Sequence, residues 1–345
     1  MPTILITGAA GFIGQLLATH LLTVHPTAPD NKLILTDIIE PPIPSQAKYP
    51  QNVQTIQADL CNASSLSSLL STASIIDTIF IFHGIMSSGS EQNFSLGMTV
   101  NLHSTLSLLE GIRTSILTQT ASPLQASGKR NPKPVRVIYA SSLAVYGRPL
   151  PSTINETTHP TPESSYGAQK LACETLIQDY IRRGYITGLC LRFPSISIRP
   201  GAPTAAASSF LSGMIREPMR GKECVIPICD RGFMSWMCSP RKLVENLVWA
   251  GEMDFDLEEL KLDTHRRVVN LPGKGASVQE MLDALVAVGG EEKLKFIREV
   301  EDEGTVKILR SWGVRYDNAF ALGLGFKEDR GFEQAVRDYV DGLEG

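Results

Sequence analysis

The sequence predicts an α/β protein, a Rossmann-type doubly wound parallel sheet with a smaller C-terminal lobe. Apolar runs alternate with helical patterns from residue 1 to about 195, which is typical of βαβ units. Three glycines spaced G-x-x-G-x-x-G follow the first run and precede an apolar helical pattern. After Pro194 prolines become more frequent and the runs shorten. We therefore expect a Rossmann domain at 1–193 and a smaller lobe at 194–345.

The predicted elements follow in chain order. After the first strand, which begins at Thr3, further strands are expected at Leu33–Asp37, Val53–Ala58, Thr78–Phe82, Val135–Ala140 and Thr187–Phe193. Helices are expected after Gly14 and at about Gln92–Leu117, Ser165–Arg183, Ala205–Ile215, Pro240–Gly251, Val278–Val288 and Phe332–Leu343. The Ser/Pro/Gly/Lys-rich segment Thr118–Pro134 indicates a surface insertion. Returns to the first domain are expected near 230–250 and at 267–271, where Val268–Leu271 resembles a further strand of the main sheet.

Composition excludes several classes of protein. The 345 residues carry a formal net charge of −4, which gives no basic face for nucleic acid and no polybasic membrane anchor. No apolar run approaches the roughly 20 residues of a membrane helix, and a glycine turn at residue 8 leaves no room for a signal peptide. The six cysteines lack zinc-like spacing, so we expect buried reduced thiols, no metal and a cytoplasmic location.

The glycine turn predicts a dinucleotide site. Gly8, Gly11 and Gly14 permit a sharp turn and close approach of a pyrophosphate. The backbone of Ala10, Phe12 and Ile13 lies between them, at the N-terminus of the following helix, where free N–H groups favour an anion.

Asp37 indicates NAD in preference to NADP. It lies 23 residues after Gly14, at the end of the second predicted strand, where a carboxylate can accept both ribose hydroxyls. The same carboxylate would repel a 2′-phosphate. The alternative is an aspartate that caps a loop or helix.

Tyr166 and Lys170 form a Y-x-x-x-K pattern on a predicted helix. Residues four apart share a helical face, and a nearby cation lowers the pKa of a phenol from about 10. Ser142, at the end of the fifth strand, places a hydroxyl at the same sheet edge. These three residues predict proton transfer coupled to hydride transfer.

Together these motifs resemble the extended short-chain dehydrogenase/reductase family, of the NAD-dependent epimerase/dehydratase type. The resemblance implies that Ser142 orients the substrate hydroxyl, Tyr166 is the acid/base, and Lys170 binds the nicotinamide ribose. It also implies a homodimer formed through the two helices expected at 92–117 and 165–183. The further cofactor contacts that we assign are Asp59, Leu60, His83, Gly84, Asn101, Pro194 and Ile196. Asn101 is equally consistent with a hydrogen bond inside a helix, and His83 with a role in positioning the backbone.

A narrower resemblance is to the D-erythronate dehydrogenases, which oxidise the C2 hydroxyl of a small sugar acid. It is carried by the segments 83–89, 191–201, 205–210, 215–218 and 236–241. The sequence departs from that pattern at Thr204, where Asn is usual, and at Gly84–Ile85, where Leu-Ala is usual.

Several residues are candidates for substrate binding. Arg199, Arg231 and Arg241 could each pair with a carboxylate through a guanidinium fork, although arginines more often form surface pairs. Ser87, Ser88 and Trp236 could line the pocket beside Ser142, and Trp236 could equally be core.

Three alternatives of function remain open from the sequence. Arg231-Gly232-Phe233 aligns with the Arg-Asp-Phe of the epimerases, which favours an NDP-sugar epimerase or dehydratase with tightly bound NAD. A ketone or aldehyde reductase and a non-catalytic dinucleotide sensor are the others.

Overall fold

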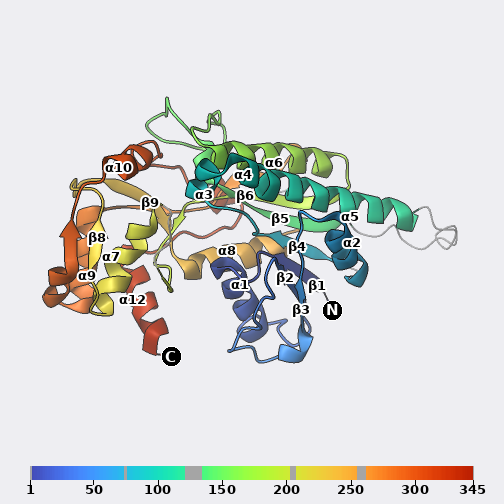
Figure 1. The fold of residues 1–345 in the computed structure, drawn as a ribbon, viewed down its shortest axis with the longest axis horizontal. Helices are drawn as coiled ribbons and strands as arrows, with labels where there is room; N and C mark the ends of the chain where they lie inside the picture. Colours follow the sequence, from blue (N-terminus) through green and yellow to red (C-terminus); the bar gives the residue numbers. More distant parts are fainter. Residues whose placement is uncertain (1, 74–75, 121–133, 203–206, 255–261, 345) are drawn as a thin grey trace.

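A parallel sheet of seven strands forms the centre of the molecule (Figure 1). The computed structural model describes residues 2–73, 76–120, 134–202, 207–254 and 262–344. The strand order is β10-β6-β5-β4-β1-β2-β3, and every neighbouring pair is parallel. The strands are β1 (Thr3–Thr7), β2 (Lys32–Asp37), β3 (Val53–Gln57), β4 (Thr78–Ile81), β5 (Val135–Ser142), β6 (Ile186–Phe193) and β10 (Val268–Asn270).

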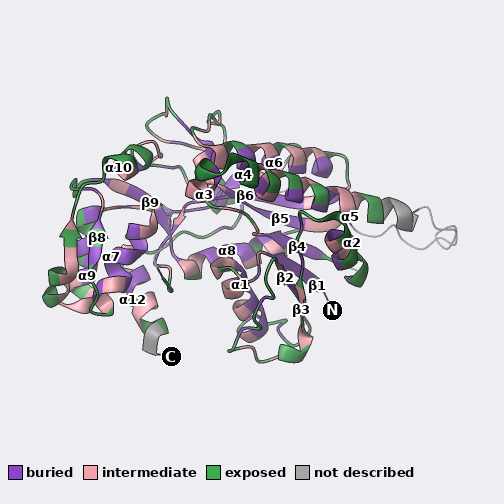
Figure 2. Ribbon diagram, viewed as in Figure 1, coloured by how far each residue is buried: buried purple, intermediate pink, exposed green. Residues whose placement is uncertain are grey.

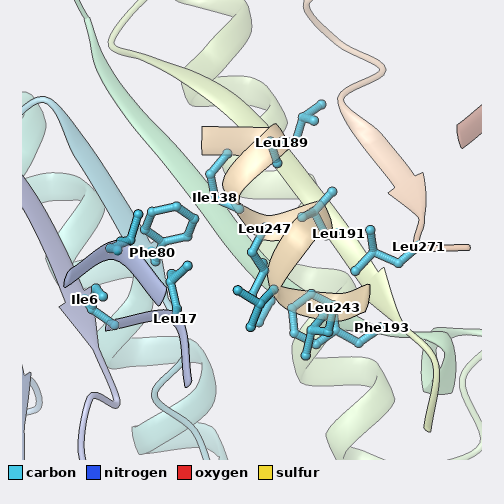
Figure 3. Close-up of a cluster of buried hydrophobic side chains, with 14 of the residues drawn as sticks. Ile6, Leu17, Phe80, Ile138, Leu189, Leu191, Phe193, Leu243, Leu247 and Leu271 are labelled. Atoms are coloured by element: carbon cyan, nitrogen blue, oxygen red, sulfur yellow. The ribbon is translucent and has the colours of Figure 1, made fainter. Parts of the chain in front are cut away.

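Helices cover both faces of this sheet, so strands such as β1, β2 and β4 are buried over most of their length, whereas the edge strand β3 is partly exposed. On one face lie α1 (Phe12–Thr23) and α8 (Pro240–Glu252), and on the other lie α2 (Ala63–Thr72), α5 (Ser104–Thr120) and α6 (Ser165–Arg182). Figure 2 shows the buried sheet between its half-exposed helices. In Figure 3, Leu17 of α1 and Leu247 of α8 pack beneath side chains of four strands.

The C-terminal half builds a second body beside the sheet, with its own core around Met214, Ile226 and Leu282. Its two small sheets have the orders β11-β9-β7 and β12-β8. Their strands are β7 (Ser195–Ile196), β8 (Cys224–Ile226), β9 (Met234–Cys238), β11 (Lys274–Ser277) and β12 (Ile297–Glu299). The helices are α7 (Ser209–Met219), α9 (Val278–Gly289), α10 (Glu303–Leu309), α11 (Ala319–Gly323) and α12 (Phe332–Glu344). Chain segments of this half also return to the first body, because α8 and β10 belong to the main sheet's layers.

The seven strands of the main sheet and most of the expected helices lie within a few residues of their predicted positions, but two expected helices differ. The strands of the two small sheets and the helices α2, α10 and α11 were not predicted. The helix expected at Gln92–Leu117 is divided into α3 (Ser87–Gln92), α4 (Phe94–Gly97), a π-helical stretch Met98–His103 and α5. The division falls after Gln92 because the Asn93 side chain caps the new helix α4, accepting from Leu96 N at 3.0 Å. The helix expected from Ala205 begins at Ser209.

The described residues also bear on the remaining expectations. Most of Thr118–Pro134 lies outside the described residues. Four of the six free cysteines are buried, but Cys61 and Cys229 are exposed, so the expectation of buried thiols is wrong for those two. Among the described residues, none of the helices combines the length and apolar character needed to cross a bilayer.

Candidate functional site

The glycine turn joins β1 to α1 with a geometry that no larger residue fits. Gly8 has a φ of +67°, and a Cβ there would lie 2.6 Å from the backbone N of His83. A Cβ on Gly14 would lie 2.7 Å from the Gly8 carbonyl oxygen. The turn is therefore a cradle of bare backbone at a helix N-terminus, which fits the pyrophosphate of a dinucleotide.

Asp37 lies directly beside this cradle. Its Oδ2 accepts a hydrogen bond from Ala10 N at 3.0 Å, and its Oδ1 accepts one from Ile38 N at 2.7 Å. An ionised carboxylate has about four acceptor positions, so both oxygens retain capacity for ribose hydroxyls. Phe12 and Ile13 follow in the first turn of α1.

His83 lies at the end of β4 and connects two elements. Its Nδ1 is 2.8 Å from Thr7 Oγ1, and its Nε2 is 2.8 Å from Ser104 Oγ. Both ring nitrogens of His83 therefore face a hydroxyl group. Burial, with the Lys170 charge, lowers the pKa of His83 to about 3. The ring is thus a neutral spacer between β1 and α5, which matches the expected positioning role.

Asn101 clamps the loop that follows His83. Its Oδ1 accepts from Ile85 N at 2.7 Å, and its Nδ2 donates to Ile85 O at 3.1 Å and to Gln169 Oε1 at 2.7 Å. A Cβ on Gly84 would lie 2.9 Å from the same Oδ1. Asn101 therefore bridges this loop to α6, so its side-chain bonds are not the helix-interior bond considered above.

Ser142, Tyr166 and Lys170 meet at the carboxyl end of β5. The Ser142 hydroxyl lies close enough to the Tyr166 phenol to lower its pKa. The Lys170 Nζ lies 5.6 Å from the centre of the Tyr166 ring and donates to Ala140 O at 2.8 Å. Tyr166 and Lys170 share a face of α6 because they lie four residues apart. The arrangement places a phenol, a hydroxyl and an ammonium group together.

Burial governs the titration of this group. It raises the pKa of Tyr166 to about 12, against the lowering effects of the Ser142 hydrogen bond and the Arg199 charge. It lowers the pKa of Lys170 to about 8. The expectation that a nearby cation lowers the phenol's pKa is therefore wrong for the protein alone, because desolvation of the phenolate is the larger effect.

A buried ion pair lies directly behind these residues. Arg192 of β6 donates to both oxygens of Glu174 of α6, at 2.9 and 2.7 Å, and both side chains are almost fully buried. The Ser141 hydroxyl donates to the same carboxylate at 2.5 Å. Arg192 also donates to Tyr146 Oη at 2.6 Å. The pair thus joins β5, β6 and α6 next to the phenol, the hydroxyl and the ammonium.

The sequence analysis missed this network. Glu174 continues the spacing of four from Tyr166 through Lys170, so an acid on the reactive face of α6 was a visible signal. Ser141 precedes Ser142 and points to the opposite side, as adjacent strand residues do. Arg192, eighteen residues from Glu174 along the chain, carried no local signal.

The three candidate arginines have different surroundings. Arg231 is exposed and pairs with Glu299 at 2.6 Å, and Arg241 is exposed and lies near Asp338 and Glu245. Arg199 is half-buried, and its charge acts on Tyr166. The structure therefore brings Arg199 near the phenol and pairs the other two with acids.

The remaining candidates line the same sheet edge or support it. Ser87 and Ser88 open α3 after the loop clamped by Asn101. Trp236 of β9 packs on Tyr316, with ring centres 5.5 Å apart, and its Nε1 is buried without a hydrogen-bond partner in the described part of the chain. Asp59 is exposed and accepts from Cys61 N, whereas Leu60, Pro194 and Ile196 are buried.

Comparisons with known proteins agree with this geometry. The model of the NAD dependent epimerase/dehydratase family matches residues 4–236. Two curated relatives are D-erythronate dehydrogenases. The one from Haemophilus influenzae is 38% identical over 338 residues, and the one from Cupriavidus necator is 36% identical over 349 residues. Each alignment covers 98% of this chain and 98% of the relative. A solved structure titled nucleoside-diphosphate-sugar epimerase from Agrobacterium tumefaciens has a TM-score of 0.84 and 32% identity, and the match covers 99% of this chain and 94% of that one.

Removing the buried carboxylate should destabilise the fold. Glu174→Gln leaves Arg192 without its counter-charge, and breaking a buried pair costs about 3–5 kcal/mol. Denaturant unfolding measures this loss. Asp179→Asn, which removes an exposed carboxylate from the same helix, is the control and should leave the unfolding midpoint unchanged. A loss no larger than the control's would show that the pair is not a structural constraint.

Removing the Asp37 charge should relax cofactor choice. Asp37→Ser loses two acceptors for ribose hydroxyls, and we expect the Kd for NAD to rise at least about tenfold. NADP binding should become detectable because the repulsion of its 2′-phosphate is gone. Asp37→Asn keeps the shape and isolates the charge. Calorimetric titration with both cofactors measures the change, and unaltered NADP binding in both variants would contradict the role of the charge.

Proposed function

The chain belongs to the NAD dependent epimerase/dehydratase family, and on that premise we propose that it is a dehydrogenase that oxidises the C2 hydroxyl of a small sugar acid such as D-erythronate. The observation that carries the chemistry is the Tyr166 phenol with the Lys170 ammonium 5.6 Å from its ring centre and the Ser142 hydroxyl close enough to lower its pKa. Two D-erythronate dehydrogenases related over almost their whole length support the substrate class.

The cofactor is NAD, which would accept a hydride from the carbon that is oxidised. The cradle of Gly8, Gly11 and Gly14 would hold its pyrophosphate, and Asp37 its adenosine ribose. The Lys170 ammonium has N–H groups beyond the one given to Ala140 O, and these would reach the nicotinamide ribose.

The residues of the chain move the proton. Tyr166 Oη takes the proton from the substrate hydroxyl as the C–H bond breaks, so it acts as a general base. Ser142 Oγ holds the substrate oxygen, and the Ser142 hydroxyl and the Arg199 charge favour the phenolate. In the reverse direction Tyr166 donates the proton to the ketone oxygen, so reduction of the ketone uses the same residues as oxidation of the hydroxyl.

An epimerase or dehydratase is the second candidate, favoured by the match to a structure titled nucleoside-diphosphate-sugar epimerase. Such an enzyme would retain NAD and regenerate it within each turnover. It would therefore purify with bound cofactor and release no net NADH. A ketone or aldehyde reductase would be revealed by faster turnover in the direction of reduction.

We further propose that the protein acts in the cytoplasm as a homodimer formed through α5 and α6. These two helices lie side by side over one face of the sheet (Figure 1). Sedimentation of the purified protein would measure its mass in solution.

Replacing the phenol should abolish oxidation without loss of cofactor binding. For Tyr166→Phe we expect kcat to fall by about 10²–10⁴ because the general base is lost, with the Kd for NAD unchanged. NADH formation at 340 nm from C4–C6 aldonic acids, with NAD or NADP, is the assay. Wild-type turnover in the variant would refute the mechanism, and absence of net NADH with bound cofactor would favour the epimerase.

Oxidation should become faster as pH rises. Tyr166 must lose its proton to act as base, and burial holds its pKa above the neutral range, so kcat/KM should rise with pH above 7. Ser142→Ala removes a hydrogen bond that lowers this pKa and should move the rising limb to higher pH by about one unit. A limb that stays in place would show that Ser142 does not stabilise the phenolate.

A further inference from the structure

We propose that Arg199 binds the carboxylate of the substrate and that Arg216, behind it, holds the Arg199 backbone in place. This inference rests on the proposed oxidation of a sugar acid and names the residue that would select acids over neutral sugars. It is drawn from the positions and charges of the two guanidinium groups.

The backbone of Arg199 is fixed from both sides by one face of α7. Its N–H donates to Ser212 Oγ at 3.0 Å, and its carbonyl oxygen accepts from Arg216 Nη1 at 3.0 Å. Ser212 and Arg216 are four residues apart and so share that face. The Arg199 side chain is aimed by Nε, which donates to Ile196 O at 3.1 Å. Its position is therefore determined by the second body of the molecule.

The two arginines carry more charge than their surroundings neutralise. Glu217 pairs with Arg216 at 2.6 Å, but no carboxylate of the described residues forms an ion pair with Arg199. Arg216 is 2% exposed, and its Nη2 is buried without a partner in the described part of the chain. A half-buried cation beside another one is costly unless an anion joins it. Burial and the Arg216 charge accordingly lower the pKa of Arg199.

The position of Arg199 relative to the phenol fits a 2-hydroxy acid. Phe193 of β6 is the register partner of Ser142, and the Arg199 Nε donates to Ile196 O, three residues beyond Phe193. The Arg199 charge also acts to lower the pKa of Tyr166. In a 2-hydroxy acid the carbon that carries the reacting hydroxyl is bonded to the carboxylate carbon. A carboxylate held by the Arg199 fork therefore directs the neighbouring C2 hydroxyl toward the Tyr166 and Ser142 oxygens.

The other candidate arginines lack these properties. Arg231 is held by Glu299 and Gln279, and Arg241 is 69% exposed beside Glu245 and Asp338. Arg231 and Arg241 are thus already in ion pairs with acidic side chains of this chain. Arg199 is the candidate that leaves a positive charge for a ligand.

The test compares Arg199→Met with Arg199→Lys. In the methionine variant we expect KM for D-erythronate, at saturating NAD, to rise about 100-fold, since a hydrogen-bonded charge pair is lost. In the lysine variant the rise in KM should be smaller, because lysine keeps the positive charge but lacks the two-pronged guanidinium group. Turnover of a neutral analogue, erythritol, and the Kd for NAD should change less than twofold. Arg298→Met removes an exposed, paired arginine and should match the wild type throughout.

Several results would overturn the assignment. They are an unchanged KM in Arg199→Met, an equal loss with D-erythronate and erythritol, or a larger effect of Arg231→Met or Arg241→Met. If the wild type oxidises no sugar acid, the proposed function fails on its own. Calorimetric titration of the NADH-loaded protein then decides the present inference: erythronate binding that disappears in Arg199→Met supports it, and binding of UDP-glucose alone, or of neither ligand, overturns it.

Discussion

The buried pair between Glu174 and Arg192 is the interaction on which the site depends. Two charges removed from water must satisfy each other with good geometry. Here the pair is completed by Ser141 of β5 and by Tyr146, which follows that strand. Glu174 is fixed on the same helix as Lys170 and Tyr166, so the pair sets the rotation of α6 against the sheet. It also fixes the tip of β5 through Ser141, next to Ser142. The ion pair therefore helps to position the Ser142, Tyr166 and Lys170 side chains, although the proposed reaction does not use the pair itself.

Desolvation is the common cause of the unusual titration behaviour at this edge of the sheet. It lowers the pKa of His83 to about 3 and that of Lys170 to about 8, and it raises that of Tyr166 to about 12. In each case burial disfavours the charged form. His83 therefore serves as a neutral spacer, whereas Tyr166 needs help from hydrogen bonds and nearby cations before it can lose a proton. Ser142 and Arg199 supply that help within the chain.

The second body contributes the positive charge of Arg199, whereas the proposed acid/base group lies in the first body. Its helix α7 holds the Arg199 backbone through Ser212 and Arg216, and no acid of the described residues neutralises that guanidinium. The first body thus provides the cofactor cradle and the acid/base group, which suit many reactions of this fold. The charge delivered by the second body is what would restrict the substrate to an anion.

The sequence by itself determined where the strands of the main sheet lie along the chain, the glycine turn and the phenol–ammonium pair, because each is a local pattern; the order of the strands in the sheet came from the structure. Gly8, Asp37, Tyr166 and Lys170 could be identified from spacing along one or two elements. It also placed the main helices to within a few residues, except where Asn93 caps a new helix. Only the tertiary structure decided which of the three arginines lacks an acidic partner among the described residues, and which residues hold α6 in place. Those answers depend on contacts between distant segments, such as Arg192 with Glu174 and Arg231 with Glu299, and on burial, which local sequence does not encode.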